Sequence, residues 1–154
     1  MKLWGTQKKV YEEGIIELIS VEDFQIIQKS DQFNFNWTKE KSYSIYKIRK
    51  RIEEQILGLI SIRDIPDELR LEIHLLEISK DNIGKKKKVD PLAGCLIAFA
   101  CDLAFQKDYD GFVSLISKTE IEKLYKEKYG FRKQGNHLYI QLDNSESLIS
   151  KYLK

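Results

Sequence analysis

The chain has 154 residues and a mass of 18.1 kDa, a length that suits one domain with its own hydrophobic core. Apolar residues make up 42% of the sequence and aromatic residues 11%, which excludes a chain that stays disordered. The net charge is only +2, from 26 Lys and Arg against 24 Asp and Glu, so there is no overall attraction to nucleic acids or anionic membranes.

The first half of the chain predicts one helix and four strands. Ser20 is expected to cap the helix, which has acidic residues in its first turn and extends to about Lys29. A polar and aromatic connection, residues 31–41, follows it. Residues 1–13 are expected to form an N-terminal extension of the single domain. The strands are predicted from their β-branched composition and alternation, at Gly14–Ser20, Ser42–Arg49, Gln55–Arg63 and Arg70–Ser79.

The second half predicts helices and strands in alternation. The first helix is apolar almost all round, as in a helix that is buried on most sides, and Asp90 is expected to cap it. Thr119 and Glu122 form the pattern of a capping box for the next helix. The predicted elements are the helix Pro91–Phe105, the strand Gly111–Ser117, the helix Thr119–Tyr129, the strand His137–Leu142 and a short final helix, Ser145–Leu153.

The order of elements is therefore β-α-β-β-β-α-β-α-β with a terminal helix. A strand, a long buried helix and a further strand form a βαβ crossover, which places Arg70–Ser79 and Gly111–Ser117 parallel in one sheet. The sequence predicts an α+β fold with a mixed central sheet and helices on both faces.

Cysteine usage and hydropathy predict a cytoplasmic protein. Cys95 and Cys101 are six residues apart in a helical run, on different faces of that helix, so we expect two buried thiols in a reducing compartment. The first ten residues contain no apolar core of a signal peptide. The longest apolar run, Leu92–Cys101, is far shorter than the roughly 20 residues that span a bilayer. No metal site and no membrane contact are expected.

One segment has the composition of a phosphate site. The four lysines Lys85–Lys88 precede a helix whose first turn contains Gly94, flanked by small residues. Free N–H groups at a helix N-terminus, together with its partial positive charge, suit a phosphate. The alternative is that the lysines form a solvated loop and that Gly94 lets the helix pack closely on the sheet.

Three segments, EIHLLEIS (72–79), AGCLIAFACDLAF (93–105) and LYKEKYGF (124–131), together with the order of elements, resemble the GCN5-related N-acetyltransferase (GNAT) superfamily. The resemblance covers roughly residues 14–142 and is to a divergent member of bacterial type. It implies that acetyl-CoA lies where two parallel central strands splay apart. The residues implied to contact it are Leu76, Glu77 and Ile78, which pair with the pantetheine arm, and Lys85, Lys86, Lys87, Lys88, Val89, Leu92, Ala93, Gly94 and Cys95 around the pyrophosphate.

This phosphate segment departs from the family pattern Q/R-x-x-G-x-G/A. With Gly94 aligned, Leu92 replaces the first glycine and the basic residue moves to Lys88. The loop between Ile78 and Gly94 is also longer than is common in the family, and its extra length contains the other lysines.

The resemblance also implies two catalytic residues. Glu72 and Ile78 fit the family pattern E-[IV]-x-x-x-x-I, in which the Glu is the general base; an acceptor such as a lysine amine has a pKa of about 10.4 and must lose a proton before it attacks. The alternative is a solvent-facing strand carboxylate paired with Arg70 or with a neighbouring lysine. His74 shares the face of Glu72 by the strand period of two, and could orient or replace it or be structural, whereas Glu77 is expected on the other face.

Tyr125 is the implied general acid for the leaving thiolate. It lies five residues before Gly130, whereas the family spacing is four and falls on Lys126. The alternative is a packing role for this tyrosine.

The resulting hypothesis is an N-acetyltransferase that moves an acetyl group from acetyl-CoA to an amine by direct transfer in a ternary complex. The acceptor could be a small amine, a protein amine or an aminoacyl-tRNA, and a homodimer is possible. One alternative is a non-catalytic GNAT-like module that binds a ligand or a protein. Another is an RNA-binding domain that uses the lysine loop and stacks bases on Trp37 and tyrosines.

Overall fold

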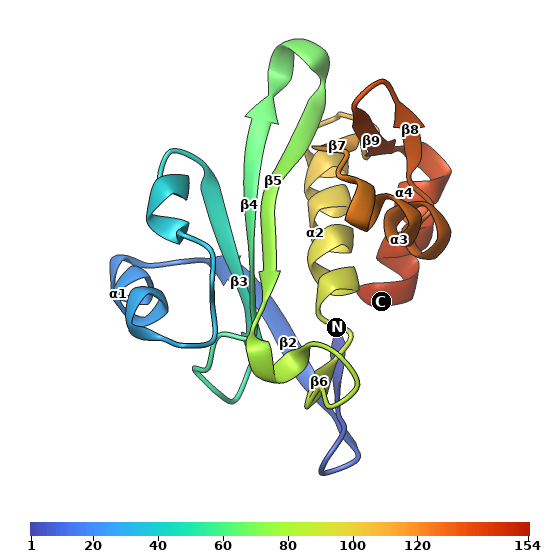
Figure 1. Ribbon diagram of the computed structural model, residues 1–154. Helices are drawn as coiled ribbons and strands as arrows, with labels where there is room; N and C mark the ends of the chain where they lie inside the picture. Colours follow the sequence, from blue (N-terminus) through green and yellow to red (C-terminus); the bar gives the residue numbers. More distant parts are fainter.

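The computed structural model describes residues 1–154 and contains one mixed sheet in the order β6-β1-β2-β3-β4-β5-β7-β9-β8 (Figure 1). The strands are β1 (Lys2–Gly5), β2 (Val10–Leu18), β3 (Ser44–Lys50), β4 (Gly58–Ile65), β5 (Arg70–Ile78), β6 (Val89–Asp90), β7 (Val113–Ile116), β8 (Arg132–Gln134) and β9 (His137–Ile140). The helices are α1 (Val21–Lys29), α2 (Ala93–Gln106), α3 (Thr119–Tyr129) and α4 (Leu142–Tyr152), with short 3₁₀ helices η1 (Trp37–Glu40), η2 (Pro66–Glu68) and η3 (Lys80–Asn82).

The predicted fold class is confirmed. Every predicted strand and helix is present in the predicted order, and β5 and β7 are parallel neighbours joined through α2. The crossover arises because α2 is too apolar to remain exposed on any side. It packs between the sheet and α4.

Three local predictions were wrong. Residues 1–13 are not an extension, because β1 and the first part of β2 pair with each other and extend the sheet. Asp90 does not cap α2; it lies in β6 opposite Trp4, and α2 begins only at Ala93. No capping box forms at Thr119, since Glu122 instead accepts a hydrogen bond of 2.8 Å from Ser117.

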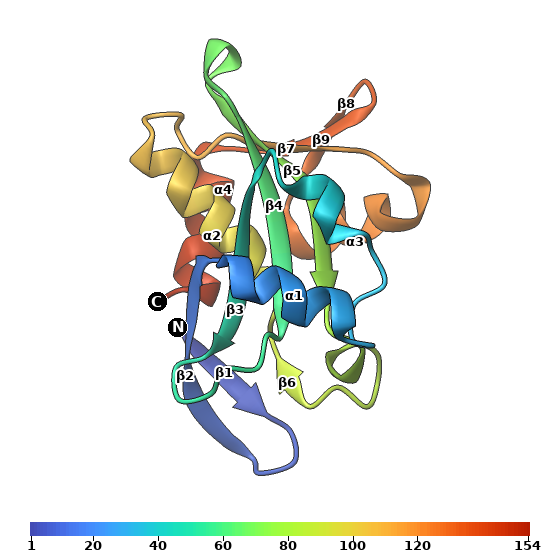
Figure 2. The same ribbon diagram turned by 90° about the vertical axis from the view of Figure 1, so that its left-hand side faces the viewer.

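The sheet separates two layers of helices. Helix α1 and η1 cover one face of β3 and β4, whereas α2 and α4 cover the other face (Figures 1 and 2). The main core lies between the sheet and the pair α2 and α4. A smaller core lies under α1 and η1 and consists of Ile27, Trp37, Ile45, Ile56 and Leu59. None of the helices has the length and apolar character that a membrane crossing needs.

Both cysteines lie inside the main core, as predicted. Cys95 and Cys101 are fully buried and are not joined to each other. Burial raises the pKa of each thiol to about 12. Neither can therefore provide a thiolate near neutral pH, which excludes both as nucleophiles.

Helix α1 is fixed to the sheet by one buried ion pair. Ser20 and Asp23 form a reciprocal capping box, and the Asp23 carboxylate also accepts a hydrogen bond of 2.8 Å from Lys47 on β3. Burial of Asp23 opposes its ionisation, but the bonds from Lys47 and Ser20 outweigh it and lower the pKa of the carboxyl. The same carboxylate therefore both starts the helix and attaches it to the sheet.

We expect Asp23→Ala to lower the free energy of unfolding by about 3 kcal/mol, since it leaves the buried Lys47 ammonium with only the more distant Glu17 as a partner. Urea unfolding at neutral pH measures this loss. Because the pKa of Asp23 is lowered by folding, the difference from the parent protein should shrink as the pH falls through that lowered value. Glu22→Ala, at the exposed neighbouring position, is the control and should change stability by less than about 0.5 kcal/mol. Equal losses in the two variants would contradict the assignment.

Candidate functional site

Strands β5 and β7 separate after two paired residues. Leu71 pairs with Val113 and Glu72 pairs with Ser114, and no strand pairing joins β5 to β7 beyond them. The edge of β5 from Ile73 to Ile78 therefore has no strand partner on the β7 side, where the two strands part (Figure 1). A strand edge of this kind offers N–H and C=O groups to an extended ligand, which can add to it as a further strand would.

A β-bulge lies at the start of this open edge. On the other side of β5, Ser61 of β4 lies opposite Leu75, whereas the next residue, Ile62, lies opposite Ile73. His74 is therefore the extra residue, and such an insertion bends a strand and redirects its side chains. The sequence gives no local indication of it.

The bulge changes which side chains share a face. Leu71 and Ile73 belong to the main core, so Glu72 between them points to the opposite face. Beyond His74 the alternation is shifted by one residue, and Glu77 also points to the α1 side, where it contacts Trp37. The expectation that Glu77 lies on the other face from Glu72 was therefore wrong.

A mostly apolar hollow of about 390 Å³ occupies the space between the two strands. Its lining residues come from β5, β7, the start and middle of α3, and the connection before η1; they are Phe35, Glu72, Ile73, His74, Leu75, Leu76, Leu115, Ile116, Lys118, Ile121 and Tyr125. An apolar cleft with a few converging polar groups is typical of a small-molecule site. The fold thus brings together three residues predicted from the sequence: Glu72, Leu76 and Tyr125.

The Glu72 carboxylate is engaged by a neighbouring guanidinium. Glu72 is buried, and its Oε2 atom lies 3.3 Å from Nη1 of Arg70. Arg70 also donates to the hydroxyl of Ser114 at 2.6 Å and pairs with Glu68 at 2.7 Å. The alternative role stated for Glu72, pairing with Arg70, is therefore present in the structure.

Tyr125 lies in the wall of the hollow. Its ring is only 8% exposed and contacts the rings of Tyr129 and Phe131 edge to face. Burial raises the pKa of its hydroxyl to about 12, so that the group stays protonated at physiological pH. Lys126, which has the usual family spacing from Gly130, lies on the exposed face and pairs with Glu122. The tyrosine, and not the lysine, therefore faces the hollow.

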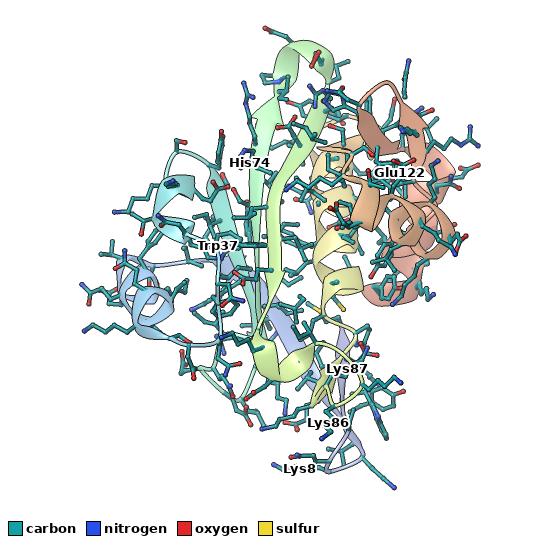
Figure 3. All side chains as sticks on the ribbon, in the orientation of Figure 1. Lys8, Trp37, His74, Lys86, Lys87 and Glu122 are labelled. Carbon is teal, nitrogen blue, oxygen red and sulfur yellow. The ribbon has the colours of Figure 1, made fainter.

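His74 has a partner that the sequence did not indicate. Its Nδ1 atom lies 2.6 Å from Oε1 of Glu40, the last residue of η1. Glu40 is buried, and the ring of Tyr43 packs on the imidazole with centroids 4.7 Å apart. Figure 3 shows His74 and Trp37 on the same side of the sheet, whereas Glu122 lies across the cleft near α3.

Glu77 ties the 31–41 connection to the cleft. Its buried carboxylate accepts hydrogen bonds from the backbone N–H of Asn34 at 2.6 Å and of Phe35 at 3.2 Å, and from Nε1 of Trp37 at 2.8 Å. Only the backbone of Glu77 is thus left for a ligand. Trp37 is 2% exposed, so it cannot stack on a nucleic-acid base, and the RNA-binding hypothesis was wrong on this residue.

The predicted phosphate segment is held by the N-terminal hairpin. Thr6 donates to the carbonyl of Lys87 at 2.8 Å through its hydroxyl and to that of Lys88 at 2.9 Å through its N–H. Lys87 and Lys88 also pair with Asp90 and Asp81, whereas Lys85 and Lys86 are exposed. Figure 3 shows Lys8 of the hairpin at the same end of the molecule as Lys86 and Lys87. The basic end thus includes two segments that are distant in the sequence.

Gly94 serves the packing of one helix on another. A Cβ at this position would collide with the ring of Tyr152 on α4. Leu92 and Cys95 are buried beside it, and the Cys95 thiol faces the carbonyl of Tyr152 at 3.6 Å. Close packing was the stated alternative for Gly94, but its partner is α4 and not the sheet. The side chains of Leu92 and Cys95 are inside the core, so only their backbone groups could reach a cofactor.

We expect Gly94→Ala to destabilise the protein by about 1–2 kcal/mol, since overpacking against Tyr152 outweighs the better helix propensity of alanine. Urea unfolding measures the change. Gly5→Ala is a matched control, because its Cβ would meet only an ordinary contact of 3.6 Å with the carbonyl of Val10. Unchanged stability of Gly94→Ala would contradict the packing role.

Solved structures with the same fold are found, although the sequence comparisons find no match. No protein-family model matches the sequence, and no curated protein matches it either. Among solved structures, a variant of the toxin AtaT bound to acetyl-CoA and the C-terminus of the antitoxin AtaR has a TM-score of 0.57 at 13% identity, covering 93% of this chain and 100% of that one. A chimera of spermidine N-acetyltransferase SpeG from Vibrio cholerae and hSSAT has a TM-score of 0.62 at 16% identity, covering 93% and 100%.

The ribosomal-protein-S18-alanine N-acetyltransferase from Escherichia coli has a TM-score of 0.58 at 11% identity and covers 84% of this chain and 92% of its own. At such low identities the likeness shows the fold that these proteins share.

Proposed function

We propose that this chain, which has the GNAT fold, is an acetyl-CoA-dependent N-acetyltransferase with its active site in the cleft between β5 and β7. The observation that carries the proposal is the unpaired edge of β5 beside an apolar hollow that contains protonatable side chains. The presence of acetyl-CoA in a structure of the similar toxin AtaT supports the choice of cofactor. The acceptor is an amine, as the names of the similar spermidine and alanine N-acetyltransferases suggest.

The residues present fit the parts of acetyl-CoA. The backbone of Leu76, Glu77 and Ile78 lies on the open edge of β5, where the amides of a pantetheine arm can pair with it. The exposed ammonium groups of Lys85 and Lys86 suit the phosphates, together with the backbone N–H groups in the first turn of α2, Ala93–Cys95. The thioester of acetyl-CoA supplies an activated acetyl group.

In this proposal the acetyl group is transferred directly, and side chains of the protein donate and accept the protons. Both cysteines are buried with raised pKa values, so a covalent enzyme intermediate is not part of the proposal. Tyr125 donates a proton to the leaving thiolate. Glu72 is the base that the family resemblance implies, and its ion pair with Arg70 is the observation that counts against it. His74 is the other group in the hollow that can accept a proton.

Saturating acetyl-CoA, at about 100 times its Kd, should stabilise the protein by about 2.7 kcal/mol and raise its melting temperature by roughly 5–11 °C. Thermal unfolding with acetyl-CoA, and with adenosine 3′,5′-bisphosphate as the control, measures this. Ile121→Trp should abolish the shift by filling the hollow, whereas Leu124→Trp, on the exposed face of the same helix, should keep it. A shift that survives Ile121→Trp would place the ligand elsewhere.

A specific observation favours a second candidate function, a non-catalytic binding module. Gly94 is covered by Tyr152, and β1 occupies part of the backbone of the phosphate segment, so the family's usual phosphate cradle is altered. The absence of any shift at millimolar acetyl-CoA would favour this candidate.

Tyr125→Phe should lower kcat by about 10²-fold while leaving the affinity for acetyl-CoA unchanged, since it removes only the proton that protonates the thiolate. Release of the CoA thiol measures the rate, with spermidine, a peptide that begins with alanine and an aminoacyl-tRNA as acceptors. Tyr129→Phe is the matched control, because Tyr129 is a buried neighbour that does not line the hollow. Equal effects of the two variants would show that Tyr125 acts through packing.

A further inference from the structure

We infer that His74, positioned by Glu40, takes the proton from the acceptor amine; this inference rests on the proposed acetyltransferase function. The two residues are 34 positions apart and come from β5 and η1. The fold brings them together at the bulge where the open edge of β5 begins. Nothing in the resemblance assigns a role to Glu40.

The Glu40–His74 contact defines which ring nitrogen is free. Glu40 is 5% exposed, and His74 is the hydrogen-bonding partner of its carboxylate, at 2.6 Å. Because an ionised carboxylate can only accept, Nδ1 of His74 must carry the proton. In the neutral ring, Nε2 then keeps its lone pair and is the atom that can accept a proton.

The ring is held at the mouth of the hollow. Tyr43 packs on one face of the imidazole, and Glu40 fixes the Nδ1 edge. The side chain nevertheless remains 40% exposed and lines the hollow between β5 and β7. Nε2, which makes no hydrogen bond within the chain, is therefore left for a substrate.

Glu72 is less well placed for the same task. Its Oε2 atom is bound to Arg70, which is itself fixed by Ser114 and Glu68. Proton transfer to Glu72 would remove the negative charge from that ion pair and leave the guanidinium beside a neutral group. No cation pairs with His74, so it can gain a proton beside the negative Glu40 without such a loss.

The groups around the ring are compatible with this role. Titratable and charged residues surround the imidazole on several elements. On the α1 side they are Glu40 of η1 and Tyr43 after it; on the sheet they are Arg63 of β4 and Glu72 of β5; across the hollow they are Lys118, just before α3, and Tyr125 of α3. Of these, Glu40 alone makes a hydrogen bond to the imidazole.

The transfer releases one net proton. His74 takes one proton from the acceptor ammonium at Nε2, and the freed nitrogen forms a bond to the acetyl carbonyl carbon while the carbon–sulfur bond breaks. The nitrogen loses its second proton to solvent as the amide forms, and Tyr125 protonates the sulfur. Solvent restores the proton of Tyr125 and removes that of His74, so the products are an amide, a thiol and one net proton.

The kinetic test uses thiol release with the amine that the acceptor panel identifies. His74→Gln should lower kcat/KM by about 10²-fold or more at pH 7, with the affinity for acetyl-CoA unchanged. The loss should become smaller at high pH, where more of the amine is already deprotonated. His137→Gln, at the other histidine of the chain, is the control and should keep the parent rate. Glu72→Gln is the competing arm and should lose less activity than His74→Gln.

Glu40 is tested as a positioning residue. Glu40→Gln should lower kcat about tenfold, alter the acidic limb of the pH profile of kcat/KM and leave the KM for acetyl-CoA unchanged, and Glu40→Asp should recover part of the rate. Nitrogen-15 NMR of the imidazole should show the proton on Nδ1 of His74 in the parent protein and a mixture of tautomers in Glu40→Gln. A proton on Nε2 in the parent protein would overturn the assignment.

The outcomes separate this inference from the proposed function. If acetyl-CoA binds and an acceptor is turned over, but His74→Gln retains the parent rate or Glu72→Gln loses more, this inference fails and the acetyltransferase proposal stands. If acetyl-CoA does not bind and no thiol is released, both fail. The NMR measurement reports on the Glu40–His74 pair in either case.

Discussion

The separation of β5 from β7 is the constraint on which the rest of the structure depends. Two paired residues join the strands, and from Ile73 onward the edge of β5 faces a hollow instead of a neighbour. Unpaired backbone groups inside a protein are costly, so a sheet would normally close such a gap. Here α3 and the connection before η1 contribute Ile121, Tyr125 and Phe35 to the walls of the hollow between the strands. The gap is therefore lined by side chains of other elements and is available to a ligand that pairs with the edge.

Two buried carboxylates join the segment 31–41 to β5 on the α1 side of this cleft, one extending from β5 and the other from η1. Glu77 extends from β5 and accepts three hydrogen bonds from residues 34–37, whereas Glu40 extends from η1 to His74 on β5. Both contacts lie on the open part of β5, on either side of Leu75 and Leu76. The segment 31–41 beside the cleft is therefore coupled to β5, the strand that would hold the cofactor. A substrate that orders this segment would also fix the orientation of the imidazole.

The sequence was sufficient where structure follows local periodicity. The buried helix α2, its parallel crossover and the two buried cysteines all follow from the apolar run after Pro91. The resemblance to a known family supplied Glu72 and Tyr125, and the fold does bring them to one hollow. Features that depend on distant partners were missed. A one-residue bulge at His74 has no local pattern, Glu40 lies 34 residues from its partner, and β6 has only two residues and pairs with β1 at the start of the chain.

The two ends of the cleft depend on different parts of the fold. The reactive end depends on the strand pair, the bulge and α3, whereas the phosphate end depends on the long loop before α2 and the N-terminal hairpin. Gly94 at the second end is covered by Tyr152, and neither residue lines the hollow at the first end. Flexible lysines attract phosphate as point charges and impose less geometry than a cradle of backbone N–H groups. In this protein the alignment of a thioester would therefore rest on β5 and its bulge, and the loop would contribute affinity more than position.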